Sequence, residues 1–276
     1  MHVAHVSTFS PTPCGIATYA ESLMESLLVG RHSKIRMLYH CDVKSTDALH
    51  EIRLENEQAY AHAAAEINCS DVDVVSLQHE FAIFGGRDGE YVLEFLEKLA
   101  KPVVTTLHTT RTLMSESQAQ IIRFIVARSA AVVVLTEQAR DNVAAIVSET
   151  SKIAVVRHGV PEVDYKLPKE TNLRREWRRE HVFFSAGHVS DRKGYTNTLA
   201  ALRELKKVTA DFLYVIVGTH QPQFGSNSQC AYSLKRTVSD FSLQDNVLFV
   251  ERYVDLDVLL DHIGDVPPAV ERCGSS

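Results

Sequence analysis

Short apolar runs alternate along the chain with longer segments in which apolar residues recur at helical spacing. The runs that predict buried strands lie at 2–7, 35–40, 72–77, 102–107, 131–135 and 152–156. Helical patterns lie between several of them, at 16–28, 88–99, 117–127 and 137–147. Strands that alternate with helices indicate βαβ units around a parallel sheet. We therefore predict one doubly wound α/β domain over residues 1–162.

The same alternation begins again after a polar, highly charged stretch at 163–180, which we interpret as a linker. Strand patterns at 182–186, 212–217 and 247–250, with a helix at 195–207, predict a second α/β domain over 181–264. This domain is expected to be incomplete, because the pattern stops after its third strand. The last segment, 265–276, fits neither period and contains paired prolines, so we predict an aperiodic tail.

Composition adds three limits to this picture. A chain of 276 residues is longer than one core usually fills, which agrees with two domains. Lys and Arg total 29 against 35 Asp and Glu, so the net charge of −6 provides no overall basic field for nucleic acid. The 5 cysteines form no C-x-x-C pair, which favours neither a disulfide framework nor a zinc site. A reducing cytoplasm is the simplest compartment.

The chain also shows no apolar run of ~18 residues that would predict a membrane span. One basic run at 173–179 fits two alternatives. It could lie on the inner face of a membrane as a peripheral contact, or it could form a solvated helix, which the interspersed Glu176 and Glu180 favour.

Polar and glycine residues follow the predicted strand at 72–77. His79, Glu80, Gly85 and Gly86 all lie in the segment QHEFAIFGG. In open α/β sheets, ligands bind beyond the carboxyl ends of the strands. These residues are therefore predicted to belong to a binding site.

Histidines also gather after predicted strands. Those within a few residues of a strand end are His79, His108, His158, His188 and His220. Each alone would ordinarily be a histidine that hydrogen-bonds the backbone, but the shared placement favours a functional edge. They are divided between two domains and lack short ligand spacing, so no metal site is expected.

Two segments have the chemistry of phosphate binding. Gly15 is expected to open the first helix, and the N–H groups at a helix start suit a diphosphate. The dinucleotide pattern G-x-G-x-x-G is absent there, and Cys14 is interpreted as an incidental thiol. In the second domain, Arg192 and Lys193 precede a predicted helix and could neutralise a phosphate, although a solvated turn with two surface charges would be the preferred explanation if the segment stood alone.

Several of these segments together resemble the family-4 glycosyltransferases of the GT-B type, in particular their mannosyltransferase-like members. The matching segments, in family order over residues 1–264, are PCGIATY (13–19), QHEFAIFGG (78–86), PVVTTLHTT (102–110), IAVVRHGVP (153–161), SAGHVSDRKG (185–194) and VGTHQP (217–222). The resemblance implies two Rossmann-like, doubly wound domains with a central cleft.

The resemblance also implies a reaction. A sugar, expected to be mannose, would pass from a nucleotide-diphosphate donor such as GDP-mannose to a hydroxyl acceptor with retention of configuration. The partners would be the nucleotide sugar and a glycan or lipid-linked acceptor, in polysaccharide or glycolipid synthesis, with no separate cofactor. A nucleotide-sugar epimerase or a phosphorylase of the same architecture is a further alternative.

By the family pattern, His108 would be the catalytic residue that contacts the donor sugar near the reacting carbon. The donor diphosphate would meet the backbone of Gly15 and Ile16, together with the side chains of Arg192 and Lys193. The acceptor side would be lined by His79, Glu80, Gly85 and Gly86.

The chain departs from that pattern in the second domain. His188 stands where many members have an arginine. The family's glutamate pair, which holds the donor, has no match, because Glu271 lacks a partner at that spacing. The alternative function is therefore a non-catalytic, truncated fragment with at most weak nucleotide binding.

Overall fold

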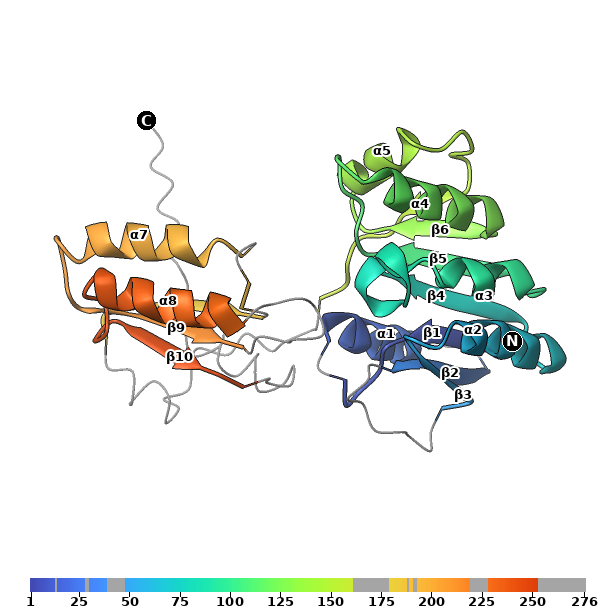
Figure 1. Cartoon of the computed structure of the whole chain (residues 1–276), viewed down its shortest axis with the longest axis horizontal. Helices are drawn as coiled ribbons and strands as arrows, with labels where there is room; N and C mark the ends of the chain where they lie inside the picture. The colour runs from blue at the N-terminus through green and yellow to red at the C-terminus, as the bar shows by residue number, and fades with distance from the viewer. Residues whose placement is uncertain are drawn as a thin grey trace. The chain divides into compact units, whose positions relative to one another are not determined.

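A computed structural model describes residues 1–12, 14–27, 30–38, 48–160, 179–187, 189–190, 193–218 and 228–252. The chain divides into two compact units, Met1–Pro161 and Glu162–Ser276 (Figure 1). Both are α/β units with parallel sheets, as predicted. The predicted tail at 265–276 and most of the predicted linker lie outside the described residues, as do His188, Arg192 and His220.

The first unit is built on a seven-stranded parallel sheet of order β3-β2-β1-β4-β5-β6-β7. The strands are β1 (His2–Ser7), β2 (Arg31–Leu38), β3 (His50–Arg53), β4 (Val74–His79), β5 (Val103–Leu107), β6 (Ala131–Val134) and β7 (Ile153–Val155). All residues of β1 are buried, as expected of a central strand. The strand order reverses between β1 and β4, which makes that gap the topological switch point where doubly wound sheets bind ligands.

Helices cover this sheet and join its strands. They are α1 (Gly15–Ser26), α2 (Glu57–Cys69), α3 (Val92–Lys98), α4 (Glu116–Arg128) and α5 (Glu137–Ala144), with short 3₁₀-helices η1 (Phe81–Ile83) and η2 (Arg87–Gly89). Helices α2, α3 and α4 pack in a row (Figure 1). Helix α4 begins at a capping box, in which Ser115 Oγ accepts from the Gln118 N–H (3.1 Å) and Gln118 Oε1 accepts from the Ser115 N–H (3.3 Å).

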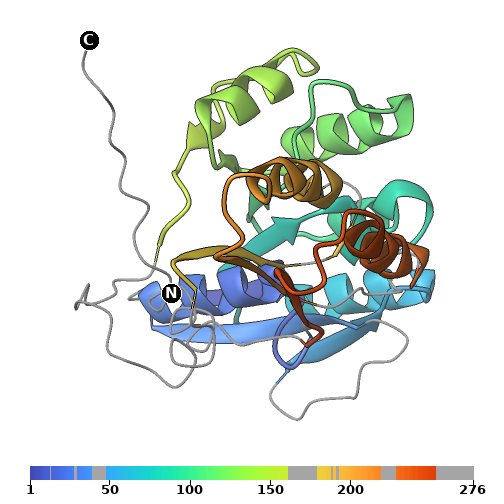
Figure 2. The ribbon, with the colours of Figure 1, turned by 90° about the vertical axis from the view of Figure 1, so that its left-hand side faces the viewer.

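The described part of the second unit has a three-stranded parallel sheet of order β10-β9-β8. Its elements are β8 (His181–Ala186), α7 (Tyr195–Leu205), β9 (Phe212–Val217), α8 (Ser228–Asp240) and β10 (Val247–Val250). Both helices lie on one face of this sheet (Figures 1 and 2). Successive residues of a strand point to opposite faces of its sheet. In β9, Phe212, Tyr214 and Ile216 accordingly pack with the helices, whereas Val215 and Val217 join a separate apolar cluster.

The structure confirms the predicted fold class and corrects it in detail. The pattern analysis missed β3 and α2, so the first sheet has one strand more than expected. Strand β3 carries the sequence HEIR and buries only its isoleucine, which gives no apolar run to detect. Strand β4 ends two residues later than predicted, so Gln78 and His79 are part of the strand rather than of the loop.

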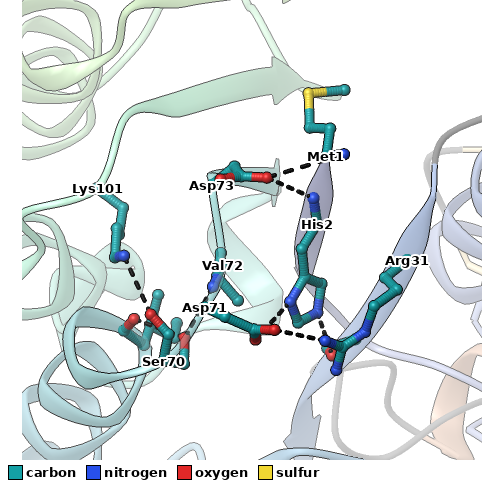
Figure 3. Close-up of polar contacts among 10 residues, drawn as sticks. Met1, His2, Arg31, Ser70, Asp71, Val72, Asp73 and Lys101 are labelled. Carbon is teal, nitrogen blue, oxygen red and sulfur yellow. Dashed lines mark hydrogen bonds and ion pairs between the residues drawn. The ribbon is translucent and has the colours of Figure 1, made fainter.

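At the amino ends of the strands, a polar network ties three segments of the first unit together (Figure 3). The His2 backbone N–H donates to Asp73 Oδ2 (2.7 Å), and its ring nitrogens contact Asp71 Oδ1 (2.9 Å) and Ser33 Oγ (2.8 Å). Arg31 also contacts the Asp71 carboxylate. A histidine ring that joins a serine hydroxyl to an aspartate carboxylate is also the arrangement of contacts in a hydrolase triad. Ser33 is half-buried inside β2, at the edge opposite to the ligand-binding edge, so we assign this network to holding β1 and β2 against the segment before β4.

Candidate functional site at the carboxyl edge of the first sheet

His108 lies at the centre of the site, directly after β5. Its backbone N–H donates to the His79 carbonyl (2.9 Å), which joins the ends of β4 and β5. Its ring Nε2 lies 2.9 Å from Oε1 of Gln78, a fully buried residue of β4. Burial lowers the pKa of His108 to about 4, with a smaller contribution from His158. The imidazole is therefore neutral at physiological pH.

Tyr19 of α1 contacts two of the predicted strand-end histidines. Its ring centroid lies 4.8 Å from that of His108 and 5.1 Å from that of His158, both in edge arrangements. The Tyr19 side chain hydrogen-bonds Thr106 of β5, although burial, the larger effect, raises the pKa of its hydroxyl. Residues from α1, β5 and the segment after β7 thus meet at one edge.

His79 is also at this edge, but it is completely buried. Its ring stacks on Phe84 (centroids 5.7 Å apart, interplanar angle 15°) and meets the ring of Phe81 edge-on (5.0 Å). Burial lowers the pKa of His79 to about 3, and His108 adds to the shift. Neither ring nitrogen has a hydrogen-bond partner among the described residues.

Two hydroxyl groups at the end of β1 are likewise buried without a hydrogen-bond partner among the described residues. Ser7 and Thr8 are fully buried, and their hydroxyl oxygens have no partner within the described part of the chain. Strands β1 and β4 are neighbours at the switch point, where Val6 pairs with Leu77. Buried polar atoms without partners are rare in native proteins and call for a ligand, a water or a functional reason. Here they collect where the topology favours a ligand.

Glu80 follows His79 and is partly exposed. Its carboxylate accepts a hydrogen bond from the Thr109 hydroxyl, next to His108 in the chain. The site therefore combines neutral imidazoles with a carboxylate on the adjacent segment.

Gly85 and Gly86 lie in a tightly packed turn beside the site. A Cβ on Gly85 would sit 1.7 Å from the Leu54 carbonyl oxygen, and the Gly85 N–H donates to Tyr60 Oη (2.8 Å). Gly86 has φ +79°, a conformation that favours glycine. Packing and backbone conformation thus require both glycines, and their role on the acceptor side stays a prediction.

The predicted phosphate-binding residues are distributed over both units. Gly15 is the first residue of α1, as expected, and is exposed with open space around its Cα. Ile16 follows it and is partly exposed. In the second unit, Lys193 is exposed and precedes Gly194, the left-handed N-cap residue of α7. The structure describes each unit by itself, so the joint binding of the donor diphosphate by these residues stays a prediction.

Sequence reasoning did not select Gln78 and Tyr19 as site residues, although both lie in the quoted segments. Tyr19 had a detectable signal, because it lies one helical turn after Gly15 and therefore on the same face of α1. Gln78 gave no such signal, since its partner His108 is 30 positions away in the sequence.

Two further searches cover only the described ranges. Within them, no group of three or more His, Cys, Asp or Glu side chains is arranged to hold a metal ion. No described helix has the length and apolar character needed to cross a membrane.

Comparisons with known proteins identify the fold. No family model and no curated protein matches the chain. Among solved structures, Alr3699/HepE of Anabaena in complex with UDP and glucose matches with a TM-score of 0.69 at 13% identity, over 94% of this chain and 71% of that one. A glycosyltransferase from Rickettsia africae matches with a TM-score of 0.62 at 15% identity, over 96% and 71%. A UDP-N-acetylglucosamine 2-epimerase from Rickettsia bellii matches with a TM-score of 0.58 at 12% identity, over 95% of this chain and 71% of that one.

The class defined by these likenesses is the GT-B architecture, with two Rossmann-like units, as the sequence predicted. Identities of this size show the fold alone. The activity must therefore be argued from the site.

Proposed function

We propose that this chain is a glycosyltransferase that moves a sugar from a nucleotide-diphosphate donor to a hydroxyl acceptor. The observation that carries the proposal is the meeting of Tyr19, His108 and His158 at the carboxyl edge, beside buried hydroxyl and imidazole groups that have no hydrogen-bond partner among the described residues. The fold supports it, since HepE, which shares it, was solved with UDP and glucose. As finer proposals, the sugar is mannose from GDP-mannose, configuration is retained, and the acceptor is a glycan or lipid-linked sugar.

The chemistry assigns different tasks to different residues. Departure of a nucleoside diphosphate builds negative charge on its β-phosphate, which N–H donors and cations stabilise. Gly15 and Ile16 at the start of α1, with Arg192 and Lys193, would provide them. Neutral His108 would hydrogen-bond the transferred sugar, and Glu80 with His79 would face the acceptor hydroxyl. No protein nucleophile is needed.

Calorimetric titration with GDP, UDP, GDP-mannose and UDP-glucose, with nucleotide release followed in parallel, tests the proposal. We expect selective binding of one nucleotide and slow release from its sugar. His108→Ala should reduce the release at least tenfold. His62→Ala, which removes an exposed histidine on α2, is the matched control and should behave as wild type. Binding of none of these compounds would instead support the alternative of a chain without catalytic activity.

The similarity to a 2-epimerase favours a second candidate, a nucleotide-sugar epimerase. Incubation with UDP-N-acetylglucosamine and chromatography of the products separates the two. An epimerase would change the sugar without needing an acceptor, whereas a transferase would leave its configuration at C2 intact.

A further inference from the structure

The amide of Gln78 faces the imidazole of His108. Gln78 is fully buried, with Oε1 2.9 Å from His108 Nε2 and its own Nε2 donating to Ser76 Oγ (3.3 Å). The backbone of His108 is held at the same place by the His79 carbonyl. The amide and the ring are therefore held against each other by neighbouring strands.

This contact determines where the His108 proton lies. A neutral imidazole carries one N–H and one lone pair, and a carbonyl oxygen can only accept a hydrogen bond. The proton must therefore be on Nε2, which leaves the lone pair on Nδ1. None of the described residues hydrogen-bonds Nδ1.

Residues of two neighbouring strands, β4 and β5, hold the rings of His108 and Tyr19 in place. Gln78 of β4 is the register partner of Thr106 on β5, and side chains at paired positions of a parallel sheet share a face. Thr106 hydrogen-bonds Tyr19, whose ring packs against His108. Two paired strand residues thus each hold one of the two rings, and sites held by strands are more precise than sites held by loops.

We propose that Gln78 is a positioning residue that keeps the His108 proton on Nε2, so that Nδ1 accepts a hydrogen bond from a hydroxyl group of the transferred sugar. This inference rests on the proposed function, because the hydroxyl belongs to the donor sugar. If Gln78 were only a satisfied core amide, its replacement by another buried side chain would leave the tautomer of His108 unchanged.

Two variants separate these roles. Gln78→Met keeps the length of the side chain and removes the carbonyl, whereas Gln78→Glu keeps an acceptor and adds a negative charge. The readout is the ¹⁵N spectrum of the histidine rings, with the His108 signals assigned by their loss in His108→Asn. Gln58→Met, at an exposed position on α2, is the matched control.

We expect the Nε2–H tautomer in the wild type, a mixture of tautomers in Gln78→Met, and the Nε2–H tautomer with a raised His108 pKa in Gln78→Glu. Nucleotide release should fall about tenfold in Gln78→Met, equivalent to about 1.4 kcal/mol, with the affinity for the nucleoside diphosphate unchanged. An Nδ1–H tautomer in the wild type, or an unchanged tautomer in Gln78→Met, would overturn the inference.

The same data separate this inference from the proposed function. If the tautomer responds as expected but the wild type binds no nucleotide sugar, the proposed function fails and the positioning of His108 stands. If nucleotide sugars bind and are turned over but Gln78→Met leaves both tautomer and release rate unaltered, the proposed function stands and the role of Gln78 is refuted.

Discussion

Replacing Gly85 with alanine should destabilise the first unit without touching any titratable group of the site. The new Cβ would lie 1.7 Å from the Leu54 oxygen and 2.7 Å from both the Leu54 carbonyl carbon and Tyr91 Cδ2. Two of these neighbours are backbone atoms, so a change of rotamer cannot relieve the clash. Overpacking of this kind costs about 1–3 kcal/mol. Displacement of the Gly85 N–H from Tyr60 Oη adds about 1 kcal/mol.

The free energy of unfolding should therefore fall by about 2–4 kcal/mol, a large part of the ~5–15 kcal/mol typical of native proteins. Urea denaturation followed by far-UV circular dichroism measures it. Gly159→Ala is the control, because a Cβ there has no neighbour within 4 Å, and it should stay within about 0.5 kcal/mol of wild type. If Gly85→Ala were as stable as the control, the packing argument would be wrong. Loss of transfer to the acceptor, with stability and nucleotide-sugar binding both unchanged, would favour the acceptor-side role instead.

Three further predictions concern the histidines, the amino edge and α1. Burial lowers the pKa values of His5, His79 and His108 to about 4, 3 and 4, below the ordinary value of 6.5. Below pH 6.5 the unfolded chain therefore binds protons that the folded chain does not, so the free energy of unfolding should be constant above pH 6.5 and fall steadily towards pH 4. Urea midpoints measured across that range would show this. Asp71→Asn should leave the urea midpoint close to that of wild type, since the carboxylate is exposed, and a clear fall of the midpoint would contradict this. Tyr19→Phe keeps the ring contacts and removes one hydrogen bond, so it should cost about 1 kcal/mol in the same assay and leave nucleotide release within about threefold of wild type.

The parts of the fold that could be predicted are those with strong periodicity. Strands β5 and β6 are rich in apolar residues, and α1 begins at Gly15 as expected. The missed helix α2 is rich in alanine, and its buried positions Ala59, Tyr60, Ala63, Ala64 and Ile67 are evident only once the helix is known. Alanine contrasts weakly with polar neighbours, so the amphipathic pattern carries little signal there.

The site could be predicted only where chemistry follows a strand end. His108 and His158 were selected for that reason, and the structure brings both to Tyr19. The contact of His108 with Gln78 depends on the register of β4 with β5, which local sequence does not encode. The full burial of His79 was also not foreseen, because the strand was expected to end at Leu77 and in fact continues through His79.

Replacement of His79 tests whether this residue serves the stability of the fold or the binding of a ligand. Its two ring nitrogens are buried without partners among the described residues, and each unsatisfied group costs about 1–3 kcal/mol. Phenylalanine would keep the stacking on Phe84 and avoid that cost, so His79→Phe should raise the free energy of unfolding by about 1–2 kcal/mol in urea melts. If a ligand or a water satisfies the imidazole in the working site, the same variant should weaken nucleotide-sugar turnover. Greater stability with unchanged turnover would assign His79 to the core and remove it from the site, and lower stability would contradict the argument from unsatisfied nitrogens.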